Sequence, residues 1–397
     1  MKDVSEEKSK GIKAYLDKRV LVMFNFGFSS GLPLMLIFSS LSLWLREAGI
    51  DRSSVTYFSW AALGFSFKFI WAPLVDRLPI PFLTKLCGRR KSWLLLSQSM
   101  VLLSIALMAM VNPAQKGMAL SLMAVAAVML GFSAATQDIV IDAFRIECAE
   151  AKMQGILSSV YIAGYRVAMI VSGAGALYLA EFFGSAMGQY SYSAWQTTYF
   201  IMSLCMLLGL LTAFVIKEPV QENVLKNHSI REYSLFFAQF ILIVIAFIFI
   251  FSSLNSMTTT LKAQLILLLK NDALVGFIGN SIRLCLSMLG AGITGFIISK
   301  IHFIRTPVLK EGYIDPIIGF FDKYGKQTSL LILSLIGLYR ISDIVLGVIS
   351  NVFYQDLGFS KTQIASVVKT FGLIMSLFGG FVGGYFTTRF GVMRILW

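Results

Sequence analysis

Runs of about twenty residues without a charged side chain recur along this sequence, and they constrain its fold more than any other feature. An apolar α-helix of that length crosses the roughly 30 Å hydrocarbon core of a bilayer. Only 14% of the residues are charged, whereas a soluble domain carries about 25%, so a soluble globular fold is excluded. We expect an all-α polytopic membrane protein with ten spans, at residues 20–44, 55–75, 93–111, 118–140, 156–182, 195–216, 234–254, 274–299, 328–350 and 364–388.

The distribution of basic residues predicts the orientation of these spans. With the N-terminus in the cytosol, 23 of the 34 Lys and Arg residues fall in cytosolic segments, six in outer loops and five within spans. Short cytosolic loops of membrane proteins carry such an excess, so the net charge of +13 does not require a nucleic acid partner. The apolar run after residues 1–19 is too long for a cleavable signal peptide. We therefore expect a cytosolic tail at 1–19 and both chain ends in the cytosol.

The loop after the second expected span reads APLVDRLPIPFLTKLCGRRK. Asp76 and Arg77, together with the basic cluster at 88–91, resemble the major facilitator loop motif GxxxDRxGRR. The motif is split here by ten residues, and Ala72 stands in place of its first glycine. A second partial copy, GYFTTRFG, follows the tenth span, with Thr388 at the Asp position. Two partial copies after equivalent spans favour an internal duplication, as in many secondary transporters.

Six longer segments resemble successive signatures of the AmpG muropeptide permease family, in the family's order. They are FGFSSGLPL (26–34), FKFIWAPLVDR (67–77), SAATQDIVIDAF (133–144), YRVAMIVSGAGALYLA (165–180), LYRISD (338–343) and GFSKTQIASVVKTFGL (358–373). The resemblance implies a major facilitator type helical bundle in a bacterial inner membrane. It also implies the import of anhydromuropeptides, which are peptidoglycan fragments, with protons. Such a carrier would be a monomer in contact with membrane lipid and would use no cofactor.

The chain departs from the family pattern in two places. Residues 217–327 hold two spans, at about 234–254 and 274–299, that a major facilitator half does not need, and we interpret them as an insertion between cytosolic segments. Residues 20–216 would then form the N-terminal six-helix bundle. Residues 328–397 would supply only the first two spans of a C-terminal bundle. The second half is therefore expected to be incomplete, as in a fragment or a truncated, inactive paralogue.

Ionisable residues inside the spans are candidates for function, because each costs about 3 kcal/mol at a helix centre and needs a partner or a watery cavity. Guanidinium groups bind carboxylates bidentately, and a muropeptide is anionic. We hypothesise that Arg166 and Arg340 contact substrate carboxylates; the alternative is that they form structural ion pairs with Asp138 or Asp343. The complete candidate substrate-binding set is Arg166, Arg340, Lys369, Lys68 and Tyr165.

The segment TQDIVIDAFR at 136–145 places Asp138 and Asp142 one helical turn apart at the cytosolic end of the fourth span. Two close and partly buried carboxylates favour binding of a proton, which suits a proton-coupling site. The alternative is a charge network that latches a cytosolic gate. We assign proton coupling to Asp138 and to Asp343, which shares a helix face with Arg340. The candidate gate residues are Asp142, Asp76, Arg77 and Arg145.

Nothing in the sequence favours a metal or nucleotide site. The two histidines, His228 and His302, have no cysteine or carboxylate cluster near them, and neither an HExxH nor a P-loop sequence occurs. We expect no enzymatic activity. Two alternative functions remain open, namely a carrier of another anionic solute such as acetyl-CoA and a membrane enzyme acting on lipid-linked precursors. For such an enzyme, Asp138 with Asp142 would be the only candidate acid pair.

Overall fold

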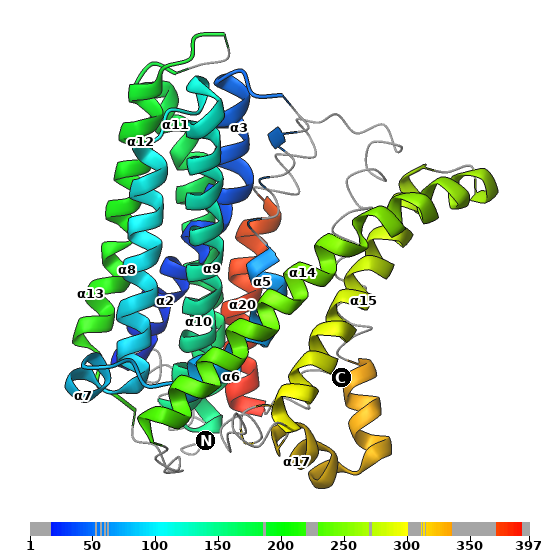
Figure 1. The fold of residues 1–397 in the computed structure, drawn as a ribbon. Helices are drawn as coiled ribbons and strands as arrows, with labels where there is room; N and C mark the ends of the chain where they lie inside the picture. Colours follow the sequence, from blue (N-terminus) through cyan, green and yellow to red (C-terminus); the bar gives the residue numbers. More distant parts are fainter. Residues whose placement is uncertain are drawn as a thin grey trace, which may run out of the picture. The chain divides into compact units, whose positions relative to one another are not determined.

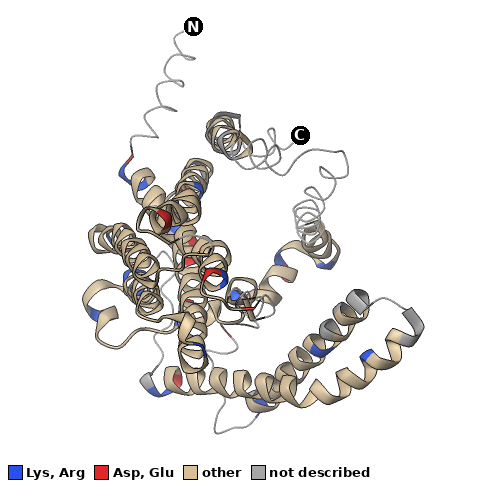
Figure 2. Ribbon diagram, turned by 90° about the horizontal axis from the view of Figure 1, so that it is seen from above, with Lys and Arg blue, Asp and Glu red and all other residues tan. Residues whose placement is uncertain are grey.

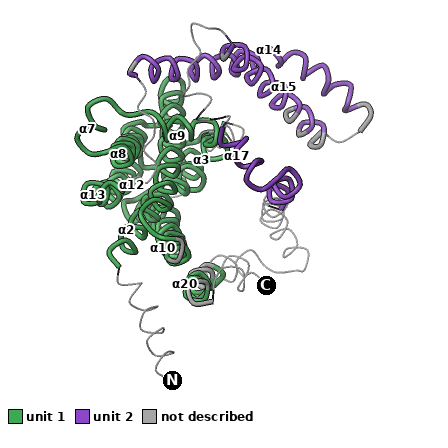
Figure 3. Tube along the Cα trace, turned by 90° about the horizontal axis from the view of Figure 1, so that it is seen from below, with its two compact units in different colours: residues 1–223, 341–397 green, residues 224–340 purple. Residues whose placement is uncertain are grey.

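The computed structural model describes residues 17–51, 63–185, 188–219, 229–269, 272–300, 315–335 and 371–390, with isolated positions at 54–55, 58, 61, 311 and 313. All secondary-structure elements named in these ranges are helices. The chain divides into two units, residues 1–223 with 341–397 and residues 224–340, coloured separately in Figure 3.

In the first unit, five helical segments of membrane-spanning length and apolarity coincide with predicted spans 1, 3, 4, 5 and 6. They run side by side in Figure 1 and are seen nearly end-on in Figure 2, where the charged residues are coloured. Two of them contain a π-helical turn, and a third is interrupted for one residue at Met206. Their elements are α2 (Lys18–Met35), η1 (Leu36–Ser40) and α3 (Leu41–Glu47); α8 (Arg89–Ala109); α9 (Gly117–Glu147); α10 (Ala151–Ile170), η5 (Val171–Gly175) and α11 (Ala176–Phe182); and α12 (Tyr192–Cys205) with α13 (Leu207–Val215). The short turn η4 (Pro113–Gln115) joins α8 to α9.

The second predicted span is interrupted rather than continuous. Its described part consists of α5 (Leu63–Phe67), the 3₁₀ turn η3 (Lys68–Ile70) and α6 (Ala72–Arg77). Pro73 has no N–H and so cannot donate to the carbonyl four residues earlier, which breaks the α-helical hydrogen-bond ladder at this point. The break places Lys68 at the start of a 3₁₀ turn. A short helix, α7 (Leu83–Cys87), follows in the loop.

Glycines bring α2 and α10 into backbone contact. A Cβ on Gly27 would lie 2.0 Å from the carbonyl oxygen of Tyr161, and one on Gly31 would lie 2.3 Å from that of Tyr165. From the other side, a Cβ on Gly164 would lie 2.1 Å from the Phe24 oxygen. Small residues in membrane helices allow backbones to approach closely, and Gly27 and Gly31 act in this way here.

Three of the glycines in the tenth span make no such close contact with the described residues. Its described part is α20 (Gly372–Phe390), and no atom of the described residues lies within 4 Å of a Cβ built on Gly379, Gly380 or Gly383. At Gly173, in η5, a Cβ would meet only the side chain of Met35, at an ordinary 3.5 Å. Close backbone approach is found instead where α2 crosses α10 and where α9 meets the second span, since a Cβ on Gly131 would lie 2.0 Å from the Ala61 carbonyl oxygen.

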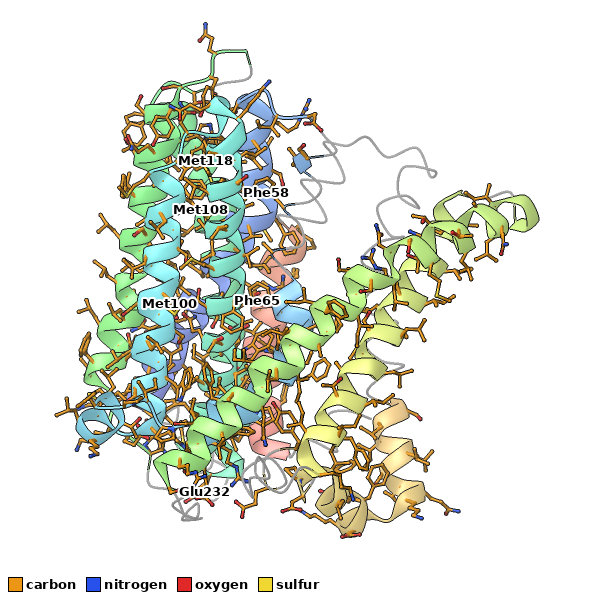
Figure 4. The ribbon with its side chains drawn as sticks, viewed as in Figure 1. Phe58, Phe65, Met100, Met108, Met118 and Glu232 are labelled. Atoms are coloured by element: carbon orange, nitrogen blue, oxygen red, sulfur yellow. The ribbon has the colours of Figure 1, made fainter. Side chains whose placement is uncertain are left out.

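Large apolar side chains fill the space between the helices (Figure 4), and Met108 of α8 is fully buried among them. Near the end of the bundle that contains η4, the rings of Trp44 and Trp195 stack at 5.6 Å. Trp195 donates its indole N–H to the Glu47 carboxylate (2.7 Å), and the Tyr199 hydroxyl donates to the Leu36 carbonyl (3.0 Å). These buried aromatic groups have hydrogen-bond partners, as a dry interior requires.

The second unit contains the hairpin of α14 (Ile230–Leu269) and α15 (Asp272–Lys300), together with α17 (Asp315–Tyr324) and a helical stretch at 326–335. The sequence predicts spans at 234–254 and 274–299 with an outer loop between them. The loop prediction is wrong for residues 255–269, since α14 continues through Lys262 to Leu269. The Arg283 guanidinium of α15 donates to the Phe251 carbonyl (2.7 Å) and the Asn255 side chain (2.9 Å) and so satisfies a charge within the hairpin.

Candidate functional site

Asp138 and Asp142 lie on one continuous helix, because α9 runs to Glu147 and not to the expected end near residue 140. A spacing of four residues puts both carboxylates on the same face. The Asp138 side chain is 11% exposed and that of Asp142 is 45% exposed. Asp138 therefore belongs to the interior and Asp142 to its rim.

Lys68 lies between the two carboxylates. Its Nζ atom is 3.9 Å from Asp138 Oδ2 and 3.8 Å from Asp142 Oδ2, so it is an ion-pair partner of both while hydrogen-bonded to neither. The interrupted span is held against α9 by Trp71, whose indole donates to the Thr136 hydroxyl (3.1 Å). One lysine from the second span thus faces an acidic pair from the fourth.

The inner side of Asp138 faces α2 and α10. The Ser30 hydroxyl lies beside both the Asp138 carboxyl and the Tyr161 hydroxyl, although it makes no hydrogen bond to Asp138 Oδ1. The ring of Tyr165 lies one turn from that of Tyr161, with centroids 6.3 Å apart. The glycine contacts between α2 and α10 are what bring Ser30 to these tyrosines.

Two glutamines extend the polar cluster into the bundle. Gln137 and Gln98 are fully buried, and each directs its amide nitrogen at the Ser29 hydroxyl, at 3.4 Å. Gln137 also approaches the Ser30 hydroxyl at 3.3 Å. Sequence reasoning missed both glutamines. The available signal was an amide inside an otherwise apolar span, which needs a partner just as a charge does.

A second cluster of charges gathers at the start of α8. The Arg90 guanidinium, 7% exposed, donates to Asp76 (2.6 Å) and to both carboxylate oxygens of Glu147. The backbone N–H groups of Arg90 and Lys91 donate to the two oxygens of Glu218, which caps the helix. The two halves of the loop motif, although ten residues apart in the sequence, are therefore brought together by the ion pair of Arg90 with Asp76. The sequence did not indicate that Glu147 and Glu218 also take part.

Gly88 makes the close approach of Glu218 possible. Its φ angle is +89°, and a Cβ there would lie 2.5 Å from the Glu218 carboxyl carbon. Both the backbone conformation and the space favour glycine at this position. The positive end of the α8 dipole then lies against a carboxylate, which stabilises the helix start.

The other candidate gate residues lie at the ends of α6 and α9. Arg145 pairs with Asp142 at 3.3 Å and also donates to the Ser158 hydroxyl of α10. Arg77 is the last residue of α6. The ion pairs of Asp76 and Asp142 therefore link α6 to α8 and extend along α9.

Arg166 differs from the other intramembrane cations. Within the described ranges it has no carboxylate partner, and its guanidinium approaches only the Met169 sulfur, at 3.9 Å. Asp138, its suggested partner, pairs with Lys68 instead. Tyr165 is its neighbour on α10. Arg340, Asp343 and Lys369 lie outside the described residues.

No three His, Cys, Asp or Glu side chains group as a metal site among the residues with described positions. The described residues form instead a cluster of charged and polar groups. One lysine pairs with two carboxylates, a buried serine and two tyrosines lie behind them, and Arg166 has no carboxylate partner in the part of the chain that the structure describes. Such an arrangement can bind an anion and accept a proton.

Comparison with known proteins gives one family and several relatives. The family model of the Major Facilitator Superfamily matches residues 20–312. The chain is 31% identical to putative transporter AmpG 4 of Rickettsia felis, over 96% of this chain and 70% of that protein. It is 27% identical to the anhydromuropeptide permease of Escherichia coli, over 98% of this chain and 59% of that protein. It is 25% identical to putative transporter AmpG 1 of Rickettsia conorii, over 94% of this chain and 93% of that protein.

Proposed function

This chain belongs to the AmpG family of the major facilitator superfamily, and on that premise we propose that it imports anhydromuropeptides from the periplasm into the cytosol together with protons. Family membership makes it a multi-pass membrane transporter rather than an enzyme. The E. coli relative is named an anhydromuropeptide permease, which supports the substrate class.

The observation that carries the coupling proposal is the position of Lys68 between Asp138 and Asp142. Because Lys68 is hydrogen-bonded to neither carboxylate, an anionic group of the cargo can compete for it. Once Lys68 turns to the cargo, Asp138 is left as a buried carboxylate without its cation, and proton binding then removes the cost of that charge. Substrate and proton would thus bind together.

The remaining candidates take roles consistent with this scheme. Arg166, which lacks a described carboxylate partner, is proposed to bind a cargo carboxylate bidentately, beside Tyr165. Arg340 and Lys369 are proposed as further cargo contacts and Asp343 as a second proton site. The ion pairs of Asp76 with Arg90 and of Asp142 with Arg145 are proposed to latch the cytosolic side, with Arg77 beside them.

We infer the remaining properties from family and charge bias. The carrier would lie as a monomer in the bacterial inner membrane, surrounded by lipid, with its N-terminus in the cytosol. Cys87 on α7 offers a test of this orientation. With all other cysteines changed to serine, an impermeant maleimide should label Cys87 in inside-out vesicles and not in right-side-out cells, and the reverse pattern would contradict the assignment.

Substrate choice is tested by uptake into proteoliposomes. Labelled anhydromuropeptide should accumulate when the outer solution is more acidic than the interior, whereas labelled acetyl-CoA should not. Accumulation of acetyl-CoA alone would favour the alternative anionic carrier. Arg166→Lys keeps the charge but loses the guanidinium fork, so it should raise the KM for anhydromuropeptide. An unchanged KM in both Arg166→Lys and Arg340→Lys would exclude bidentate recognition.

Coupling is tested by Asp138→Asn. This variant should lose accumulation driven by the pH gradient, because the amide cannot exchange a proton. Glu181→Gln is the matched control, since Glu181 is an exposed carboxylate at the end of α11. Proton-driven accumulation that survives in Asp138→Asn would remove Asp138 from the coupling role.

A further inference from the structure

The buried glutamines are held in one orientation by a serine. The Ser29 hydroxyl donates its only hydrogen to the Phe26 carbonyl, at 3.0 Å. Its oxygen can therefore only accept hydrogen bonds, and both Gln98 and Gln137 must present their NH₂ groups to it. Turning either amide over would place an acceptor against an acceptor.

This orientation points both amide oxygens away from Ser29, so their hydrogen-bond donors must come from elsewhere. Within the described part of the chain, Gln98 Oε1, Gln137 Oε1 and Asp138 Oδ1 have no hydrogen-bond partner. An unsatisfied polar atom in an apolar interior costs more than an ordinary hydrogen bond contributes, and such atoms in native proteins call for a bound donor. All three belong to residues less than a tenth exposed.

The charge balance distinguishes between the possible donors. Asp138 is the only carboxylate in this group, and Lys68 already pairs with it at 3.9 Å. A metal cation would therefore enter a site with no negative charge left to balance it. Water donates two hydrogen bonds, carries no charge, and commonly bridges buried polar groups of this kind.

The polar groups continue beyond Gln98 toward one end of the bundle. Gly209 of α13 lies directly over Ser29 and Gln98, since a Cβ there would be 2.5 Å from Ser29 Cβ. One turn further along both helices, the Asn25 amide donates to the Thr212 hydroxyl at 3.0 Å. Thr212 lies in the last turn of α13, whose terminal carbonyls bind Lys91 at the start of α8.

We propose that internal water molecules bridge Gln98 Oε1, Gln137 Oε1 and Asp138 Oδ1, and that this hydrated row joins Asp138 to the Asn25–Thr212 end of the bundle. The inference rests on the proposed function, because it gives Asp138 a route for its proton that is separate from the substrate passage. On release, the O–H bond of protonated Asp138 breaks, the proton passes to water of the row, and Lys68 pairs with the carboxylate that remains.

The test compares two transport modes in proteoliposomes. Gln98→Leu and Gln137→Leu keep side-chain volume and remove the amides. They should slow uptake driven by a pH gradient by about tenfold or more, since water chains and positioned groups are worth on the order of 10²–10⁴-fold in proton transfer. Counterflow of labelled against unlabelled anhydromuropeptide at equal pH needs no proton release and should stay close to wild type. Gln196→Leu is the control, because its amide donates to Tyr192 outside the row.

A structural measurement keeps the proposal testable if the leucine variants do not fold. Cryo-electron microscopy of the unaltered protein in nanodiscs, at a resolution that shows water, should find density within hydrogen-bonding distance of Gln98 Oε1 and Gln137 Oε1. The proposal of a hydrated row would be wrong if the map showed no water density beside these oxygens. It would also be wrong if both leucine variants kept wild-type rates of pH-driven uptake. Failure of the proposed function is distinct, since it would appear as pH-driven uptake that survives Asp138→Asn.

Discussion

Replacing Gly27 by alanine tests whether backbone contact between α2 and α10 supports the site. The new Cβ would lie 2.0 Å from the Tyr161 carbonyl oxygen, and Cβ atoms essentially never approach closer than 3.0 Å. The atom that the new Cβ would meet belongs to helix backbone, which cannot rotate away as a side chain can. The two helices must therefore separate locally by about 1 Å. Such overpacking costs about 1–3 kcal/mol. Alanine recovers about 1 kcal/mol of helix propensity, which leaves a net loss of up to about 2 kcal/mol.

The assay is thermal unfolding of the purified protein in detergent, followed by tryptophan fluorescence. Each kcal/mol corresponds to about 2–4 °C in a chain of this order of size, so Gly27→Ala should lower Tm by up to about 8 °C. The same shift moves Tyr161 away from Ser30, so transport should fall as well.

Gly173→Ala is the matched control for this experiment. Its Cβ would meet only the Met35 side chain, at 3.5 Å, in the same pair of helical segments. Its Tm should equal or exceed that of the wild type, because alanine fits the space and favours the helix. A Gly27→Ala protein as stable and active as Gly173→Ala would refute the inference that the close contact is needed.

Substitutions at three further residues test the charged clusters. Arg90→Leu leaves the partly exposed Asp76 and Glu147 without their shared cation and should destabilise the protein by about 1–3 kcal/mol in denaturant titration. Arg90→Lys should recover only part of this loss, and equal midpoints for Arg90→Leu and wild type would contradict the prediction. Glu218→Ala removes the cap of α8 and should cost about 0.5–2 kcal/mol in the same assay; no loss would mean that the cap is redundant. Lys68→Gln leaves Asp138 without its cation and should abolish pH-driven accumulation, whereas Lys68→Arg should keep a measurable fraction; normal accumulation in Lys68→Gln would show that Lys68 is not the exchangeable partner.

Most spans were predictable because the bilayer imposes a strict requirement on length and charge. The predicted end of the fourth span was wrong because charged residues that are typical of loops form ion pairs with other helices there. The charges at the end of α9 suggested that the span stops near residue 140, but Asp142 pairs with Lys68 and Glu147 with Arg90, and the helix continues to Glu147. Pro73 could be seen in the sequence, but the apolar residues on both sides of it satisfied the length requirement of a span and so concealed the break.

The sequence predicted which site residues share a face of one helix, but not which residues of different helices pair with each other. The spacing of Asp138 and Asp142 on one face follows from helical periodicity, which is a local property. The partner of Asp138 is Lys68, seventy positions earlier, and nothing in the spacing of either residue distinguishes it from Arg166 as a counter-ion. Cross-helix pairing depends on which helices touch, and that is set by the glycine contacts of α2 with α10 and of α9 with the second span.

The segment FGFSSGLPL shows why these properties occur together. With 3.6 residues per turn, Gly27 and Gly31 lie about 40° apart around α2, whereas Ser29 lies about 200° from Gly27. The two glycines meet α10, Ser30 reaches Asp138 and Tyr161 beside them, and Ser29 faces Gln98 and Gln137 on the other side. One helical turn therefore serves close packing, the acidic site and the buried glutamines at once. Ser29→Ala should then disturb both glutamines, whereas Ser30→Ala should disturb the acidic site and Gln137 alone, because the Gln137 amide approaches both hydroxyls and the Gln98 amide only that of Ser29.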